Sequence, residues 1–145
     1  MNWVHLLTSF EGRISRQSFW IGWAVLVAAE IAVWLGTRQF NDERVGAVAD
    51  LVMLYPQFAV SAKRGHDRNT PTWVIGLFFA LSAVFDLLQF GGWVTSASLE
   101  QQTTLVTVIF IPIGLFAVVL VVDLGFRRGT VGPNRYGPDP LDAQT

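Results

Sequence analysis

The sequence predicts an all-α protein: an integral membrane four-helix bundle built from two helical hairpins, with residues 1–145 forming a single membrane domain. One observation is composition, since 52% of the residues are hydrophobic and only 14% are charged, too few to cover a soluble domain. Another is that four stretches are each apolar enough to cross a hydrocarbon core of about 30 Å, which takes about 20 helical residues. Basic residues are also distributed unevenly between the two sides that four spans create.

The four predicted spans cover residues 19–37, 46–62, 73–95 and 103–122. The fourth span contains no charged residue and is the clearest. The second span is the shortest, and it is interrupted by Asp50, Pro56 and Gln57. Pro112 lies near the middle of the fourth span and should kink that helix or loosen its hydrogen bonding, because proline has no N–H and its ring crowds the preceding turn.

Two short segments beside the spans carry local signals. Before the first span, apolar residues follow the i, i+3, i+4, i+7 spacing of one helix face, namely Trp3, Leu6, Leu7 and Phe10. This spacing predicts a short N-terminal helix in the inner membrane interface, and the alternative is a frayed terminus with scattered apolar residues. Before the third span, Thr70 is predicted as the N-cap and Pro71 as the first helical position.

Basic residues predict how the spans are oriented. One side of the membrane receives the N-terminal segment, the loop after the second span and the tail at 125–145, and it holds eight of the ten basic residues. These are Arg13, Arg16, Lys63, Arg64, Arg68, Arg127, Arg128 and Arg135. The other side holds Arg38 and Arg44. Because cytoplasmic loops carry the excess of basic residues, both termini and the tail are predicted to be cytoplasmic.

Composition also argues against several functions. The net charge is −1, whereas nucleic-acid binding usually demands a strongly basic face, so no nucleic-acid partner is predicted. The chain has no cysteine, which removes disulfides, zinc–thiolate sites and iron–sulfur clusters. With His5 and His66 as the only histidines, no metal site is predicted. Motifs that typify phosphate-binding loops, zinc proteases and serine hydrolases are missing, so the sequence predicts no cofactor and no enzyme.

The predicted cytoplasmic side carries the first candidate site. Topology brings three distant segments to this face, and the candidate residues are Arg13, Arg16, Lys63, Arg64, His66, Asp67, Arg68, Asn134, Arg135 and Tyr136. Nine of the ten basic residues are arginines, and guanidinium forks match phosphate oxygens, so a phosphate or an anionic lipid headgroup could bind here. Each basic residue near the surface attracts anionic lipid by about 1 kcal/mol. The alternative is that the arginines only set topology, while glycines end helices and prolines shape the tail.

The same segments carry a family resemblance. Three motifs, at residues 10–20, 63–68 and 132–140, resemble in order and spacing those of small bacterial inner-membrane proteins called the domain of unknown function 805 family. The resemblance covers Phe10 to Pro140. In that family the middle motif usually continues into Ser-Gly-Trp-Trp, whereas this chain keeps a single tryptophan at Trp73. The resemblance implies a location in the bacterial cytoplasmic membrane and a four-helix plan, and it implies no activity.

A pair of intramembrane acids is the second candidate site. Glu30 and Asp86 should lie about 17 and 20 Å above the inner boundary, at similar depth. A carboxylate near mid-membrane costs about 2.5–3.5 kcal/mol, so each acid should face protein or water. The predicted spans contain no lysine or arginine to pair with them. The functional interpretation is a proton or cation path, and the structural alternative is hydrogen bonding between helices.

Three hypotheses about function follow. The leading one is an accessory or scaffold protein in the lipid bilayer whose cytoplasmic Arg-rich face binds a membrane-protein partner or an anionic lipid. The second is a small ion or solute translocator that uses Glu30 and Asp86, as a homo-oligomer because four helices enclose little volume. The third is a lipid-headgroup enzyme that depends on His66.

Overall fold

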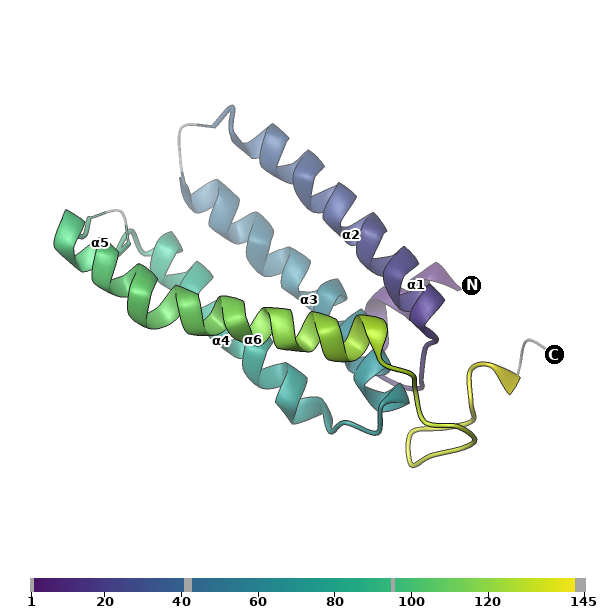
Figure 1. The fold of residues 1–145 in the computed structure, drawn as a ribbon. Helices are drawn as coiled ribbons and strands as arrows, with labels where there is room; N and C mark the ends of the chain where they lie inside the picture. Colours follow the sequence, from purple (N-terminus) through teal and green to yellow (C-terminus); the bar gives the residue numbers. More distant parts are fainter. Residues whose placement is uncertain (1, 41–42, 95, 143–145) are drawn as a thin grey trace.

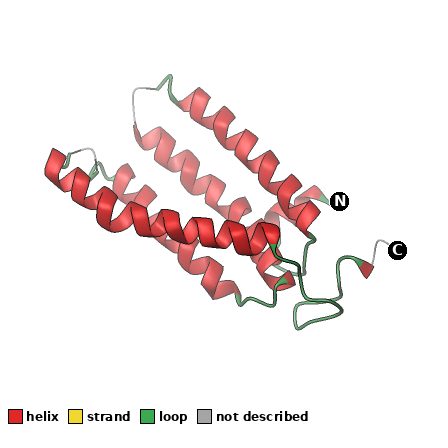
Figure 2. Ribbon diagram, viewed as in Figure 1, coloured by secondary structure: helices red, strands yellow, loops and turns green. Residues whose placement is uncertain are grey.

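The computed structural model describes residues 2–40, 43–94 and 96–142, and every regular element among them is a helix (Figure 2). A short first helix is followed by three long ones and by a last helical run that includes two π-helical turns (Figure 1). In chain order the elements are α1 (Trp3–Thr8), α2 (Arg16–Thr37), α3 (Glu43–Asp67), α4 (Thr72–Phe90), α5 (Leu99–Leu105), η1 (Val106–Phe110), α6 (Ile111–Val121) and η2 (Val122–Phe126).

Four helical segments of the described chain are long and apolar enough to cross a membrane. They cover Arg16–Thr37, Arg44–Asp67, Thr72–Phe90 and Thr107–Phe126. Their lengths of 19 to 24 residues correspond to about 28 to 36 Å, which matches the hydrocarbon core of a bilayer. The predicted all-α membrane bundle is therefore confirmed. Large apolar side chains such as Leu35, Leu77 and Val118 stay exposed on these helices, as suits contact with lipid.

The second long helix is longer than predicted, since α3 continues five residues beyond position 62. The prediction stopped where charged residues begin at Lys63, but these side chains have hydrogen-bond partners inside the protein. α3 ends in a Schellman motif, in which the Thr70 N–H donates to the Gly65 carbonyl at 2.8 Å. The Asn69 N–H donates to the His66 carbonyl at 3.0 Å, and Asn69 takes the left-handed conformation (φ 58°) that this motif requires.

The third long helix also differs from its prediction at both ends. α4 begins at Thr72, one residue after the predicted first helical position Pro71, because Thr70 belongs to the end of α3 and Pro71 occupies the N-cap. α4 ends five residues before position 95, at the Gly91-Gly92 pair, because glycine is a poor helix former and Gly92 has a φ of 72°. Position 95 itself lies outside the described residues, as do positions 143–145 of the predicted tail.

The last helical run extends beyond the predicted span 103–122 at both ends, from Leu99 to Phe126. The π-helical turn η1 lies just before Pro112. Pro112 cannot donate a backbone hydrogen bond, and its ring would crowd the Val108 carbonyl, so the extra residue of a π turn relieves this conflict. The predicted loosening around Pro112 is confirmed.

α3 lies at the centre of the bundle and packs against α1, α2 and α4. The last helical run packs on α4 through α6, meets α2 and α3 at η2, and diverges from α2 toward the opposite end (Figure 1). The buried apolar core consists of Leu6, Phe19, Leu26, Val60, Ile75, Phe79 and Leu124. Because α1 and η2 contribute to it, this core lies largely toward the end of the bundle where both termini are found.

The predicted N-terminal helix is present as α1. Leu6 is 3% exposed and packs into the core, whereas Trp3 and Val4 on the same helix stay exposed. Leu7 also packs against the core, so two residues of the predicted apolar face, Leu6 and Leu7, face α3 and the core, whereas Trp3 of that face is turned outward.

Candidate functional site

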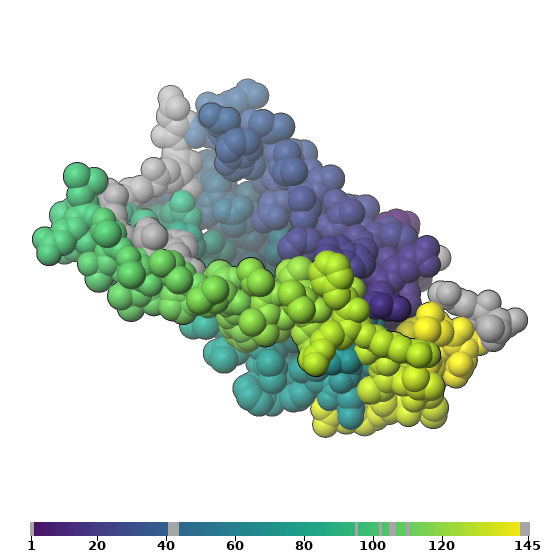
Figure 3. Space-filling model, in the orientation of Figure 1, coloured from purple at the N-terminus to yellow at the C-terminus, as the bar shows by residue number. Residues whose placement is uncertain are grey.

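Three segments far apart in the sequence meet at one end of the bundle, close to both termini (Figures 1 and 3). These are residues 9–16, 63–70 and 126–142, and we call their assembly the polar end. The ten residues predicted as a binding cluster all lie on it, namely Arg13, Arg16, Lys63, Arg64, His66, Asp67, Arg68, Asn134, Arg135 and Tyr136. The structure brings these residues together, and their binding of a ligand stays a prediction.

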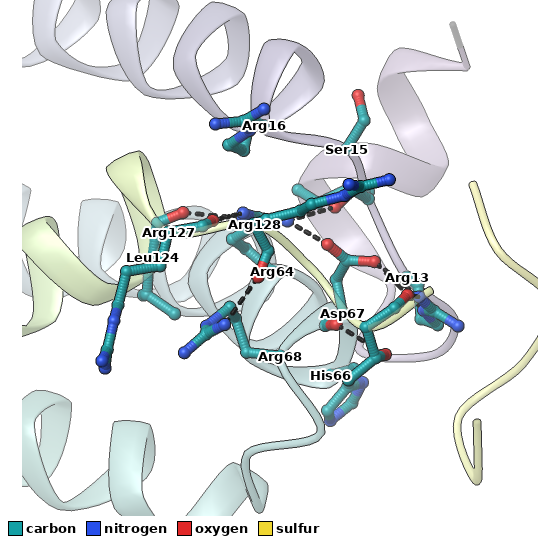
Figure 4. Close-up of polar contacts among 12 residues, drawn as sticks. Arg13, Ser15, Arg16, Arg64, His66, Asp67, Arg68, Leu124, Arg127 and Arg128 are labelled. Atoms are coloured by element: carbon teal, nitrogen blue, oxygen red, sulfur yellow. Dashed lines mark hydrogen bonds and ion pairs between the residues drawn. The ribbon is translucent and has the colours of Figure 1, made fainter. Parts of the chain in front are cut away.

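A buried carboxylate lies at the centre of the polar end (Figure 4). Asp67 accepts from Arg13 on one oxygen, at 2.9 Å from Nη2, and from Arg64 on the other oxygen. The side chains are 4% exposed for Asp67 and 1% for each arginine. Two guanidinium groups share one carboxylate, so the buried group has a net positive charge that other acceptors must stabilise.

Backbone carbonyls of the tail supply the acceptors for Arg13. Its guanidinium donates to the Thr130 and Gly132 carbonyls at 2.7 Å each and to the Gly137 carbonyl at 3.2 Å. Gly129 lies directly over Asp67, where a Cβ would overlap the carboxylate. The segment before α2 is thereby fastened to the tail through the end of α3.

The end of the last helix supplies the acceptors for Arg64. An α-helix leaves its last carbonyls without intrahelical partners and carries partial negative charge there. In this chain the carbonyls of residues 124–128 all accept from side chains on α2 and at the end of α3. The donors, in that order, are Arg64, Trp20, Arg16, Arg64 and Arg68, at 2.6, 3.0, 3.3, 2.6 and 2.6 Å. The arginines therefore cap the last helix.

Lys63 has the same role toward α1. Its ammonium nitrogen, in a residue that is 0% exposed, lies 2.5 Å from the His5 carbonyl and 2.6 Å from the Leu6 carbonyl. Both carbonyls belong to the short helix α1, and the His5 carbonyl also accepts from the Ser9 N–H at 3.2 Å. Lys63 therefore attaches α1 to α3.

His66 uses both ring nitrogens within the protein. Nδ1 lies 3.1 Å from the Gly12 carbonyl, which can only accept, so Nδ1 carries a hydrogen. Nε2 lies 2.7 Å from the Thr72 hydroxyl, which donates to it when the imidazole is neutral. The ring also stacks on Tyr136, with centroids 3.9 Å apart. His66 and Asp67 point to different partners, so they do not form a catalytic pair.

The tail folds into a compact turn against the end of α3. The Asn134 side-chain amide donates to the His66 carbonyl and to the Thr130 hydroxyl, at 2.9 Å each. Arg135 lies over the Tyr136 ring, 4.7 Å from its centroid, and donates to a carbonyl of the α3–α4 turn. These contacts fix the position of the tail on the polar end.

Asp139 closes the tail on itself. Its carboxylate accepts from the backbone N–H groups of Leu141 at 3.0 Å and Gly132 at 2.9 Å, and these bonds hold its pKa below the usual range. The lowered pKa keeps the carboxylate ionised in the folded protein. Its contribution to the structure of the tail is complete above the pKa of the unfolded state, and it is lost as the pH falls through the lower pKa of the folded state.

A cavity of about 270 Å³ opens on the polar end between the start of α2 and the tail, and Arg16, Arg64 and Arg128 line it. Arg64 is committed to the buried network. Arg16 and Arg128 are exposed, and the hydrogen bond that Arg16 donates to the Phe126 carbonyl is long, at 3.3 Å. Within the described residues the Arg128 side chain donates none, and Asp139 is its electrostatic neighbour. Guanidinium donors therefore remain available to an anion.

Sequence reasoning missed the role of Asp123. It lies between two arginines, 3.1 Å from Arg68 and 2.9 Å from Arg127, and joins the last helix to the α3–α4 turn. Asp123 lies one residue beyond the end of the predicted fourth span, and it was not among the candidate site residues. Its spacing of four residues before Arg127 is the favourable one for an ion pair on a helix, and it was the available signal.

The two predicted intramembrane acids line a separate cavity of about 340 Å³ inside the bundle. Glu30 accepts from the Gln57 amide at 3.3 Å, and Asp86 is 8% exposed. Asp50, which the sequence analysis named only as an interruption of the second span, lines the same cavity. The signal was the position of residues 50, 54 and 57, which recur on one face of α3. The structure thus adds polar neighbours that the sequence interpretation lacked.

Comparison with known proteins identifies relatives over nearly the whole chain. A family model described as protein of unknown function (DUF805) matches residues 7–138. The uncharacterized protein YiiR of Escherichia coli K12 is 32% identical over 139 residues, which cover 95% of this chain and 90% of that protein. The inner membrane protein YhaH of the same organism is 26% identical over 137 residues, which cover 90% and 86%. No solved structure matches.

Proposed function

The chain belongs to the DUF805 family of proteins of unknown function, and from the geometry of its polar end we propose that it is an accessory protein of the bacterial inner membrane that binds the phosphate of an anionic lipid headgroup. The observation that carries this proposal is the cavity lined by Arg16 and Arg128, whose guanidinium groups are exposed. The chain is a multi-pass membrane protein, so a lipid headgroup is present at the surface of each of its ends.

Orientation supports a cytoplasmic polar end. The three segments that form it hold eight of the ten basic residues, as the positive-inside rule requires of a cytoplasmic face. The cytoplasmic leaflet also carries the anionic lipids that basic residues attract. A cytoplasmic polar end therefore places Arg16 and Arg128 beside the lipids that they would bind.

The chemistry of the cavity favours phosphate. Arginine presents several N–H donors in a planar fork that fits phosphate oxygens, and Arg16 and Arg128 together offer two such forks. Arg64 adds positive charge behind them, because it shares its carboxylate partner with Arg13. Asp139 also lines the cavity, and its negative charge opposes an anion. Its carboxylate accepts from backbone N–H groups, so the three arginines of the lining outnumber it.

Native mass spectrometry of protein released from nanodiscs tests this proposal. The nanodiscs contain equal amounts of phosphatidylglycerol and phosphatidylcholine with identical acyl chains. We expect the wild-type protein to retain phosphatidylglycerol, and the double variant Arg16→Gln/Arg128→Gln to bind it about tenfold to thirtyfold more weakly, since each arginine contributes about 1 kcal/mol. The double variant should keep its stability, because its two side chains make few internal hydrogen bonds.

The matched control is Arg38→Gln/Arg44→Gln, which removes the same charge from the opposite end of the bundle. We expect this control to retain phosphatidylglycerol as the wild type does. Equal retention of both lipids by the wild type, equal losses in the two double variants, or a protein partner or second copy retained in place of lipid would each contradict the lipid assignment.

A further inference from the structure

The cavity inside the bundle has an excess of acidic groups that the lipid proposal does not use. It lies among α2, α3, α4 and α6, and its acidic lining groups are Glu30 on α2, Asp50 on α3 and Asp86 on α4. These residues lie 14 to 17 positions from the polar ends of their helices, which corresponds to about 21 to 26 Å. Three carboxyl groups therefore surround one space at similar depth in the membrane.

Asp86 is the group without a partner. It is more than nine-tenths buried, it lines the cavity, and within the described part of the chain it accepts no hydrogen bond. Its electrostatic neighbours are Asp50 and Glu30, which are acids too. Among the described residues, no lysine or arginine lines the cavity. An unpaired carboxylate at this depth is costly, and a bound cation would offset that cost.

The rest of the lining indicates which cation fits. Among the described residues no group of three or more His, Cys, Asp and Glu side chains converges as metal ligands, so these carboxyl groups surround a space of about 340 Å³ instead of holding a single ion. Phe78 and Phe85 also line it, together with Leu54 and Ile113. Aromatic faces attract ammonium groups, and apolar walls attract the hydrocarbon part of an organic ligand.

We propose that this cavity binds a small organic cation, a substituted ammonium whose charge is held by Asp86 with Asp50 and Glu30. The hydrocarbon part of the ligand packs against Phe78 and Phe85. This site is independent of the polar end and goes beyond the proposed lipid binding. It also gives a substrate class to the translocator hypothesis of the sequence analysis.

Equilibrium binding of radiolabelled benzyltrimethylammonium tests the proposal. The protein is placed in nanodiscs of phosphatidylcholine, which carry no net charge to concentrate the cation, and empty nanodiscs are subtracted. We expect saturable binding at one site, weakened at least about tenfold by Asp86→Asn and retained by Asp86→Glu. The control Glu11→Gln removes the same charge at an exposed position on the polar end, and its binding should equal that of the wild type.

Competition and a second variant keep the test decisive. Neopentylbenzene, the uncharged isostere, and sodium or magnesium at equal concentration should not displace the ligand. Ser82→Phe keeps all three acids but fills the cavity, so it should also abolish binding, and this variant decides the matter if Asp86→Asn does not fold. Binding that is no greater than to empty nanodiscs, that survives both Asp86→Asn and Ser82→Phe, or that inorganic cations or the isostere displace equally would overturn the proposal.

Discussion

Replacing Asp67 by asparagine is expected to lower the free energy of unfolding by about 3 kcal/mol. The substitution keeps the shape of the side chain but leaves the guanidinium groups of Arg13 and Arg64 buried with no carboxylate between them. Removing one partner of a buried pair costs far more than the pair itself contributes, because the remaining charge stays desolvated. Asp67 also lies where three segments meet, so its loss should loosen the tail and the segment before α2 together. Equilibrium unfolding in mixed micelles measures the change.

Asp123→Asn is the matched control for this measurement. Asp123 is also bonded to two arginines, but its side chain is 26% exposed and one partner, Arg127, is 66% exposed. Solvent can replace the lost interactions there, so we expect a cost below about 1 kcal/mol. Equal losses for the two variants would show that the buried carboxylate is not the centre of the polar end.

Arg64→Lys is expected to lower the free energy of unfolding by about 2 to 3 kcal/mol although the charge is kept. Arg64 donates to the Leu124 and Arg127 carbonyls at 2.6 Å each while it also pairs with Asp67. A lysine ammonium is a point charge on a flexible stem and does not reach these three acceptors in one plane. At least one carbonyl at the end of the last helix would then stay buried without a donor.

Arg127→Lys provides the control, since its side chain is 66% exposed and makes one ion pair. We expect its stability to stay within about 0.5 kcal/mol of the wild type. The measurement is again equilibrium unfolding, with hydrogen exchange at residues 124–128 as a local readout. If Arg64→Lys unfolds like the wild type and protects those amides equally, the arginine fork is not what caps the last helix.

The membrane bundle could be predicted from sequence because the requirement for it is simple. Each span needs about 20 apolar residues, and a run without charge, such as 103–122, has few alternatives in water. Pro112 could be interpreted for the same reason, since its missing N–H disturbs any helix that contains it. These features depend on local composition alone, and the structure agrees with them.

The ends of the helices could not be predicted, because they depend on contacts between distant segments. Lys63 and Arg64 each carry a positive charge, which normally favours an exposed position. Both are nevertheless 0% exposed and lie inside α3. They are buried there because α1 and the last helix bring carbonyls to them, and no local pattern in residues 63–68 contains that information. The same contacts made α3 longer than its apolar stretch.

The candidate sites show a similar division. Topology alone brought the arginine segments to one face, but it could not tell which arginines are buried among carbonyls and which, like Arg16 and Arg128, stay open. That Glu30 and Asp86 lie at similar depth in the membrane could be predicted by counting residues along their two helices. Asp50 was missed because α3 begins earlier and its register against α4 depends on side-chain packing.

The lipid proposal requires the polar end to be cytoplasmic, and cysteine labelling tests this orientation most directly. The chain has no cysteine of its own, so single substitutions report without background. Val131→Cys, 75% exposed on the polar end, and Leu99→Cys, 83% exposed at the opposite end, are treated with a membrane-impermeant maleimide in intact cells. We predict labelling of Leu99→Cys in intact cells and of Val131→Cys only after permeabilisation. Labelling of Val131→Cys in intact cells, with Leu99→Cys protected, would place the arginines outside and contradict the proposal.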